Sequence, residues 1–391
     1  MHRGAWHQFG DRSQKLVLEQ LQQGNGVGVI VSPRDLSWAN AQEYAAQYHS
    51  LGAEVVIDQQ FYVPDFSNKH LDSYATNQYR LAASSLHQLN DQQLSHLATA
   101  MQQVNGSLDA DAVIAPAMAY EAGRPDIVSL NARLFSAAKN AGDALGKPTL
   151  ATVVLGNSVT SAGQTVRTAL SQATALSADG WYYAFEFPPE RIPSASSHVL
   201  RCCVAGLTLA CTGKPVLHAY AGPMGLLSFG FGATGAAIGH SQNLWSFSRS
   251  RWEAPVAQGG GGDAPARLFS GSLWGTIVYP DETAQLPQSL TSQIVTDSPF
   301  LVPWDRWQAN KHLVYTVCST LAALAAHSDP RLCAQAATSV LTDAVGYHSS
   351  IAGLGVTLRD DTSAYQANWL NAVNDLLTQH GDDFDYLALL A

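Results

Sequence analysis

The segment VGVIVSPRDLSWANAQEYAAQYHSLGAEVVIDQQFY, residues 27–62, has an apolar run at each end and a helical pattern between the two runs. The runs at 27–33 and 53–62 are rich in valine and isoleucine, as buried strands are. Residues 38–52 alternate as an amphipathic helix does, and Gly52 is a typical helix stop. A strand, a helix and a second strand in this order predict a parallel βαβ unit.

The same alternation continues along the chain. Strands are predicted at 27–33, 53–62, 111–117, 148–156, 180–187, 214–222, 236–240 and 272–279. Eight strands with intervening helices predict a (β/α)8 TIM-type barrel. The alternative is an open doubly wound sheet, and the absence of a GxGxxG or P-loop motif after the run at 27–33 weakens its nucleotide-binding form.

The barrel prediction divides the chain into three parts. Residues 1–24 are predicted to be an N-terminal helical lead-in, and 25–285 the barrel. After residue 300 the pattern becomes wholly helical, which predicts a C-terminal helical region over 300–391. This appendage would either pack on the barrel or offer a surface to a protein partner.

Composition narrows the classes of function. The 391 residues are 46% hydrophobic and only 13% charged, which predicts a well-packed core and a surface covered largely by Gln, Ser, Thr and Asn. The formal net charge of −10 does not support nucleic-acid binding through a broad basic surface. Nucleic acid bound through a local patch stays open.

Other sequence features bear on metals, cofactors and location. The five cysteines form no CxxC or Cys/His pattern with zinc spacing and lie among apolar residues, so we expect buried free thiols, no metal and no cofactor. The N-terminus has no apolar signal-peptide core, and the longest mainly apolar stretch is too short to span a membrane. We therefore expect a cytoplasmic protein without a membrane partner.

Residues that follow the strands of a barrel converge on one mouth, where barrel enzymes carry their chemistry. Asp58 follows four apolar residues and is the first catalytic candidate, because a desolvated carboxylate must find a partner or undergo a rise in its pKa. Alternatively, it caps a turn or pairs with Arg34. Glu186 lies in GWYYAFEF on the face of Tyr182 and Ala184, predicted to be the lumen, where it is either functional or locked to an arginine.

His240 ends the predicted strand at 236–240 and is a candidate general base or hydrogen-bond donor. Further residues at the predicted mouth are candidates for substrate binding: Arg34, Gln59, Gln60, Tyr220, Gln242 and Asn243. The amides of Gln59 and Gln60 offer both donors and an acceptor to an amide-like or base-like edge. They can equally satisfy loop backbone.

A glycine-rich stretch lies between the last two predicted strands. Its Gly260 and Gly261 can bring backbone N–H groups close to a ligand, and Arg267 follows with a guanidinium. Barrels often bind phosphate in this region, so an anion clamp is predicted. The alternative is a surface loop without a ligand.

The run Asp58-Gln59-Gln60-Phe61-Tyr62 resembles a strand end of the tRNA-guanine transglycosylase barrels, and KPVLHAYAGPMGLLSFGFGATGAAIG, residues 214–239, is similar to a late-barrel segment of that family. The resemblance implies exchange of a purine-like base in nucleic acid through a covalent aspartate, with Asp58 helping to bind the base. The sequence departs from the family where residues 235–237 read Gly-Ala-Ala in place of the nucleophilic aspartate. The family's zinc-binding cysteines also have no counterpart.

The leading functional hypothesis is an enzyme that acts on a nucleotide- or base-containing substrate by glycosyl transfer or hydrolysis. Two carboxylates at a barrel mouth are also the equipment of a glycoside hydrolase, which is one alternative. The other alternative is a non-catalytic barrel that binds a ligand or serves as a subunit of a larger assembly. The sequence does not decide among these.

Overall fold

The computed structural model describes residues 1–64, 66–84, 89–188, 192–241, 244–250, 265–302, 304–360 and 362–390. Its central sheet is parallel and has the strand order β3-β2-β1-β8-β7-β6-β5-β4. The strands are β1 (Gly4–Gln8), β2 (Gly28–Val31), β3 (Glu54–Ile57), β4 (Val113–Ile114), β5 (Thr149–Leu155), β6 (Gly180–Phe185), β7 (Val216–His218) and β8 (Gly235–Ile238). A hydrogen bond of 2.9 Å from the backbone N–H of Asp111 to the carbonyl of Val55 joins the edges near β4 and β3, so the sheet forms a nearly closed barrel.

The predicted (β/α)8 barrel is confirmed, but one of its strands was not predicted and one predicted strand lies outside it. Residues 1–24 are not only a helical lead-in, because they contain β1, which pairs with both β2 and β8. The predicted strand at 272–279 is not a barrel strand. It contains β10 (Gly275–Val278), which pairs with β9 (Arg267–Ser270) in a separate antiparallel sheet.

Side chains alternate between two apolar layers on each barrel strand. Trp6, Ile30, Val56, Tyr182 and Leu217 belong to the cluster that fills the barrel interior. Their neighbours in sequence pack outward against the helices. The predicted lumen-facing side of the strand before Glu186 is therefore confirmed, since Tyr182 and Ala184 are in the interior cluster.

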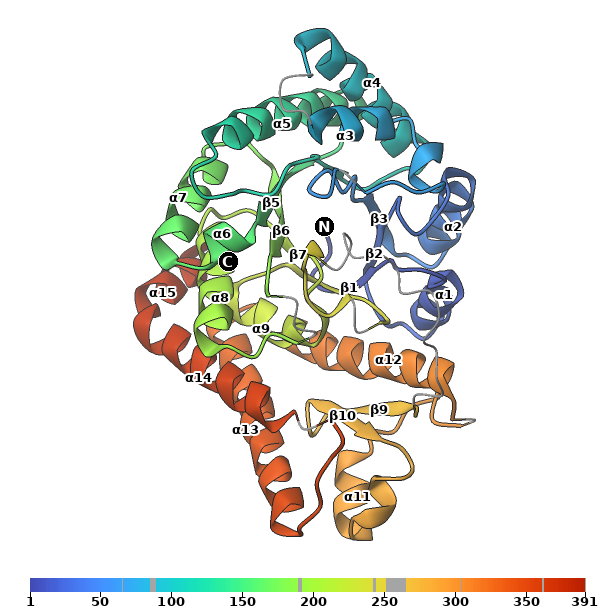
Figure 1. Cartoon of the computed structure of the whole chain (residues 1–391), viewed down its shortest axis with the longest axis vertical. Coiled ribbons are helices and arrows are strands. Elements are labelled where there is room, and N and C mark those ends of the chain that lie inside the picture. Colours follow the sequence, from blue (N-terminus) through green and yellow to red (C-terminus); the bar gives the residue numbers. More distant parts are fainter. Residues whose placement is uncertain are drawn as a thin grey trace.

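Trp6 and the N-terminus close the end of the barrel where the strands begin. A Cβ on Gly28 would lie 2.5 Å from Cζ3 of Trp6, so only glycine leaves room for the indole there. The N-terminal amine lies 3.2 Å from a carboxylate oxygen of Glu54 at the start of β3. In Figure 1 the N-terminus accordingly lies in the middle of the ring of strands.

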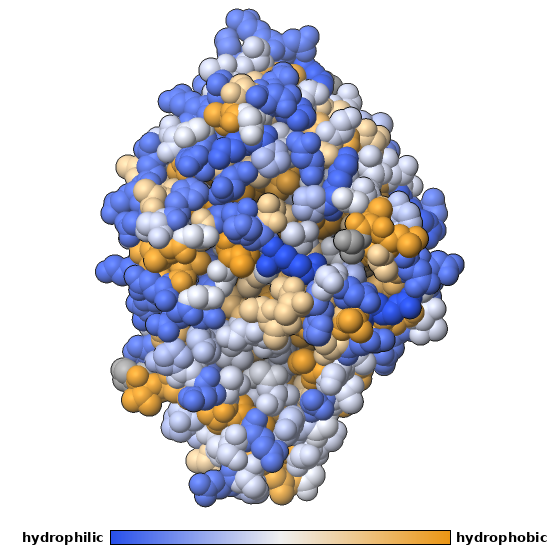
Figure 2. Space-filling view, turned by 180° about the vertical axis from the view of Figure 1, so that it is seen from behind, coloured by the Kyte–Doolittle hydropathy of each residue, from blue (hydrophilic) through white to orange (hydrophobic). Residues whose placement is uncertain are grey.

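Helices surround the barrel as Figure 1 shows. They are α1 (Gln14–Gln22), α2 (Trp38–Ser50), α3 (Asn77–Ser84), α4 (Asp91–Ser107), α5 (Pro125–Leu145), α6 (Asn157–Thr160), α7 (Gly163–Thr174), α8 (Ser196–Ala210) and α9 (Gly225–Ser228). The expected polar, charge-poor surface is clear on α4, whose exposed side chains include Gln92, Ser95, Thr99 and Gln102. The upper part of the molecule in Figure 2, over α3 to α5, is correspondingly hydrophilic.

The region after residue 300 contributes to the barrel itself. Its helices are α12 (Arg306–Ala325), α13 (Pro330–Gly353), α14 (Ser363–Gln379) and α15 (Gly381–Leu390). Helix α12 packs against β1, β8, α1 and α9 and so occupies the place of the helix that follows β8. The division into three parts stays a prediction, but α12 packs as part of the barrel's helical ring.

The other C-terminal helices form an outer layer. Helix α14 packs on α8, where the Trp369 indole N–H donates to the carbonyl of Pro193 at 2.7 Å. The sheet of β9 and β10 lies outside the ring together with α11 (Gln288–Ile294) (Figure 1). The five cysteines are free thiols, as expected, and four of them are buried. No helix among the described residues is long and apolar enough to cross a membrane.

Candidate active site

Asp58 lies one residue beyond β3, and its side chain enters the barrel mouth with only 2% of the residue exposed. Its carboxylate accepts four hydrogen bonds from three parts of the fold. The hydroxyls of Tyr62, Tyr182 and Tyr220 donate to Oδ2 at 2.5, 2.7 and 3.4 Å, and the backbone N–H of Gln60 donates to Oδ1 at 2.9 Å. The strand-end position predicted for Asp58 is therefore the centre of a polar cluster in the interior.

Burial dominates the electrostatics of this cluster. It raises the pKa of Asp58, although the hydrogen bonds from Tyr62, Tyr182, Gln60 and Tyr220 act in the opposite direction. Burial likewise raises the pKa of all three tyrosines well above the usual value, so their hydroxyls remain protonated donors. A carboxyl that holds its proton to a higher pH than an exposed one is suited to donate or accept a proton in a reaction.

The backbone around Asp58 adopts a conformation that non-glycine residues rarely take. Gln60 has a φ of 55° and Tyr220 a φ of 52°, both in the left-handed region. The Gln60 amide is bound by the protein: its Nε2 donates to Ser32 at 3.0 Å and to Tyr220 at 3.2 Å, and its Oε1 accepts from the backbone of Arg34 at 3.4 Å. Strain of this kind is retained where the surrounding structure holds the residues in place, which is common at functional sites.

A second polar cluster joins the ends of β4, β5 and β6. Glu186 is 1% exposed and accepts from the backbone N–H of Asn157 at 2.9 Å. The Arg249 guanidinium lies 2.7 Å from Glu186 Oε2 and also pairs with Glu121. Of the two interpretations given for Glu186, the described contacts are those of a carboxylate locked to an arginine.

The segment 244–250, which follows β8, closes the mouth over the interior. Leu244 and Phe247 belong to the interior cluster, and the ring of Phe247 packs edge-on against Tyr62 at 5.2 Å. The backbone N–H of Phe187, just after β6, donates to the carbonyl of Phe247 at 3.0 Å. The pair of Arg249 with Glu186 thus fastens a segment that starts at β8 to the end of β6.

Gln8 is a polar residue of the mouth that sequence reasoning missed. It ends β1 on the same side as Trp6, whose side chain is in the interior cluster, and it is 1% exposed. Neither its Nε2 nor its Oε1 has a hydrogen-bond partner among the described residues. GAWHQ carries too few apolar residues to predict a strand, so the sequence pattern gives no signal that Gln8 lies at a strand end.

The other predicted site residues are spread around the mouth or away from it. Gln59 accepts from the Thr76 hydroxyl at 2.6 Å, and Arg34 stacks on Phe66 with its guanidinium carbon 4.5 Å from the ring centre. His240 lies beyond β8 beside Trp307 of α12, with ring centres 6.1 Å apart, and burial lowers the pKa of His240 to about 4. These three do not contact the Asp58 carboxylate in the described structure.

Arg267 begins β9 and pairs with Asp360, so the structure places it in the small sheet outside the ring rather than beside Asp58. The remaining predicted residues, Gln242, Asn243, Gly260 and Gly261, lie outside the described residues. No group of three His, Cys, Asp or Glu side chains in the described parts of the chain is arranged to hold a metal ion.

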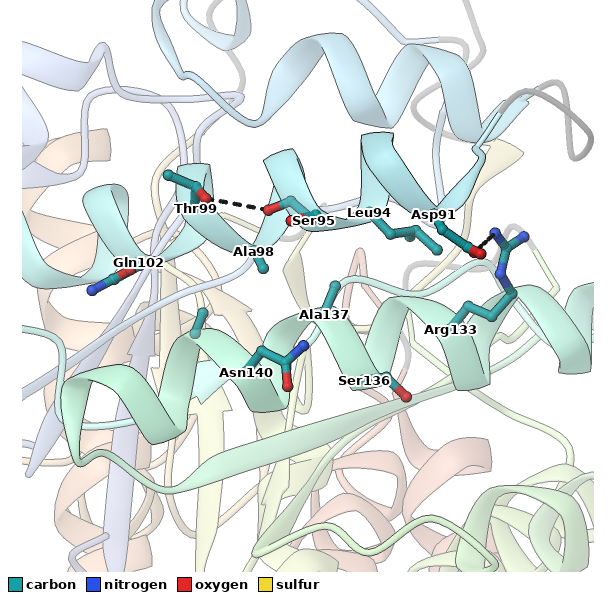
Figure 3. A pocket seen from close by; sticks show the side chains of 11 residues that line it. Asp91, Leu94, Ser95, Ala98, Thr99, Gln102, Arg133, Ser136, Ala137 and Asn140 are labelled. Carbon is teal, nitrogen blue, oxygen red and sulfur yellow. Dashed lines mark hydrogen bonds and ion pairs between the residues drawn. The ribbon is translucent and has the colours of Figure 1, made fainter.

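Hollows at the surface of the described part of the chain include two that lie between outer helices. One of about 450 Å³ runs between α4 and α5, with the ion pair of Asp91 and Arg133 at one end (Figure 3). It lies between two outer helices and contains none of the mouth residues. The other, of about 240 Å³, lies between the start of α5 and α7 and includes Glu121, the partner of Arg249. Of these two, the second adjoins the polar cluster of Glu186 and Arg249.

No protein-family model matches this chain, and no curated protein sequence matches it either. Among solved structures, it is similar to 3-dehydroquinate dehydratase from Aquifex aeolicus, with 10% identity, a TM-score of 0.37, and coverage of 64% of this chain and 95% of the other. It is also similar to a D-psicose 3-epimerase solved in the presence of D-fructose, with 10% identity, a TM-score of 0.35, and coverage of 82% and 98%. Neither is a tRNA-guanine transglycosylase, and the barrel assignment rests on the strand order of the chain itself.

Proposed function

We propose that this protein is a barrel enzyme that acts on a nucleotide- or base-containing substrate by glycosyl transfer or hydrolysis, with Asp58 as the group that exchanges a proton. The observation that carries the proposal is the Asp58 carboxyl, which is buried at the carboxyl end of β3 and oriented by three tyrosine hydroxyls and one backbone N–H. Breaking a glycosidic bond requires a proton for the leaving group, and a carboxyl with a raised pKa can supply it.

The choice of a base-containing substrate has its own grounds. It rests on the resemblance of Asp58-Gln59-Gln60-Phe61-Tyr62 to the transglycosylase strand end and on the amide and phenol groups around Asp58, which suit a neutral heterocycle. Substrate would reach Asp58 only after residues 244–250 move, because Leu244 and Phe247 now cover the interior. The covalent aspartate mechanism of that family is not proposed, because residues 235–237 offer no carboxylate.

The test is release or exchange of a base. Wild-type protein is incubated with nucleosides, nucleotides and single-stranded oligonucleotides, and free base is measured by chromatography. Asp58→Asn should lower turnover by roughly a hundredfold or more, the usual contribution of a positioned acid or base. Asp91→Asn is the matched control, because the Asp91 side chain is fully exposed on α4 and should leave turnover unchanged. Full turnover in Asp58→Asn would refute the role of Asp58.

The pH profile adds a second readout. If Asp58 acts as the acid, activity is retained while the carboxyl is protonated and falls as the pH rises through its raised pKa. Asp58→Asn should remove this limb of the profile from any residual activity. A limb that persists unchanged in the variant would assign the titration to another group.

A second candidate function is a non-catalytic barrel that binds a ligand or a protein partner. The observation that favours it is that both oxygens of Asp58 already accept hydrogen bonds from the protein, while Glu186 is paired with Arg249. A glycoside hydrolase, the other alternative, needs two available carboxyls. Incubation with aryl glycosides in the same assay tests it, and ligand binding without turnover of either substrate class would favour the non-catalytic barrel.

A further inference from the structure

Gln8 is the most conspicuous unsatisfied group at the barrel mouth. The last residue of β1, it points inward as Trp6 does, while Ala5 and Phe9 belong to the outer clusters. It is 1% exposed, and both ends of its amide lack a partner among the described residues. A buried carboxamide without hydrogen bonds opposes folding, so its presence calls for a compensating role.

Two other buried glutamines, Gln20 and Gln60, are bound by the protein at both ends of the amide, whereas Gln59 and Gln366 each lack a partner among the described residues at one end only. Gln20 is fully buried, and its Nε2 donates to the carbonyl of Lys311 at 3.0 Å while its Oε1 accepts from Asn25 at 3.3 Å. Gln60 is bound at both ends as described above. Gln8 therefore differs from glutamines that hold the fold together, because its hydrogen-bonding capacity is left open inside the barrel.

The position of Gln8 matches that of Asp58. Strands β1 and β3 alternate around the barrel, and inward-pointing residues of alternate strands share a layer. Gln8 and Asp58 are both the final inward residues at the carboxyl ends of their strands. On β8, which pairs with β1, the next strand end carries His240, whose Nδ1 is likewise buried without a partner among the described residues. His240 lies beside Trp307 of α12, however, so of these two groups Gln8 is the one that points into the barrel.

We propose that the Gln8 carboxamide recognises a nucleobase through a lactam edge, in which a ring N–H lies beside a carbonyl. A carboxamide offers an N–H donor and an oxygen acceptor side by side, so it can form two parallel hydrogen bonds with such an edge. Because the amide is buried, a base that lacks the complementary pair would leave it unsatisfied and would be rejected. This inference rests on the proposed function in naming a base as the substrate, but it concerns binding and not the chemical step.

The test measures the binding of free bases by calorimetry. Hypoxanthine and uracil carry a lactam edge, whereas purine has no carbonyl and 1,3-dimethyluracil has no ring N–H beside its carbonyls. Wild type should bind hypoxanthine or uracil, and it should bind the analogue of that base that lacks the lactam edge roughly tenfold more weakly or worse. Gln8→Met should lose this preference and weaken binding of the lactam base by a similar factor. Gln20→Met, the matched control, should bind as wild type does.

Two arms keep the test decisive. The comparison of bases on wild type needs no variant, and Gln8→Glu, which keeps the acceptor but removes the amide donor, replaces Gln8→Met if that variant does not fold. Binding that depends on Gln8 without any release of base from nucleosides would refute the proposed function and leave this inference standing. No binding of any base to wild type, or unchanged binding in both Gln8 variants, would overturn the inference and indicate that only water meets Gln8.

Discussion

Replacing Gln8 by methionine should stabilise the free protein. Methionine has nearly the same length but no polar atoms, so it removes a buried donor and a buried acceptor that have no partner among the described residues. Leaving such a group unsatisfied costs about 1–3 kcal/mol, so Gln8→Met should raise the free energy of unfolding by about that amount. Gln20→Met should lower it by about 1–3 kcal/mol, because the carbonyl of Lys311 and the amide of Asn25 lose their partners.

The assay is urea unfolding followed by tryptophan fluorescence, with wild type and both variants measured side by side without ligand. Linear extrapolation gives each free energy of unfolding, and an unchanged slope shows that the variants unfold over the same surface. The two variants should differ by about 2–6 kcal/mol, with wild type between them. A loss of stability in Gln8→Met as large as that in Gln20→Met would refute the reasoning, since it would mean that Gln8 is satisfied in the folded protein.

Three further outcomes are expected. Arg249→Ala leaves the buried Glu186 without its guanidinium partner and should lower the free energy of unfolding by about 3–5 kcal/mol, with faster hydrogen exchange at Phe187 and Phe247. Arg124→Ala, the control, breaks an exposed pair with Asp126 and should change neither the stability nor the exchange. Burial lowers the pKa of His7 and His312 to about 4 and that of His218 to about 3. Because these histidines take up protons below about pH 6.5 only in the unfolded state, the free energy of unfolding should fall as the pH drops, by about 2 kcal/mol per histidine at pH 5. Replacing His218 by glutamine should make this dependence on pH less steep in urea titrations. Gly28→Ala should destabilise by about 1–3 kcal/mol in the same assay because its Cβ would lie 2.5 Å from Trp6, whereas Gly346→Ala, with open space around it in α13, should be neutral or stabilising.

The barrel could be predicted because its strands are short, apolar and separated by helices. Strand β5 is buried along its whole length, and apart from Thr149 and Thr152 its residues are apolar, as is typical of parallel strands with both faces covered. Strand β1 fails this rule, because Trp6, His7 and Gln8 interrupt the pattern. The apolar run of β10 satisfies it equally well, although it belongs to a hairpin, and no local pattern separates a barrel strand from a two-stranded sheet.

The site was predictable in part for a related reason. A carboxylate directly after an apolar strand places Asp58 at the mouth, and strict alternation places Tyr182 on the interior face. The partners of each group could not be predicted, because they come from distant segments: 124 residues separate Tyr182 from Asp58, and 63 separate Arg249 from Glu186. Pairing across a barrel depends on the register of strands that sequence periodicity does not encode.

The polar groups at the mouth divide into two kinds, and this division suggests how the site works. Asp58, Gln60 and Glu186 are held by the protein's own donors, so their geometry is fixed before any ligand arrives. The Gln8 amide has no partner among the described residues at either end, and because Gln8 points inward it can gain hydrogen bonds from a ligand that enters the barrel. A ligand would therefore gain affinity at the end of β1 and meet a preorganised carboxyl at the end of β3. Recognition and proton transfer would then depend on different residues, so Gln8 variants should alter binding while Asp58 variants alter turnover.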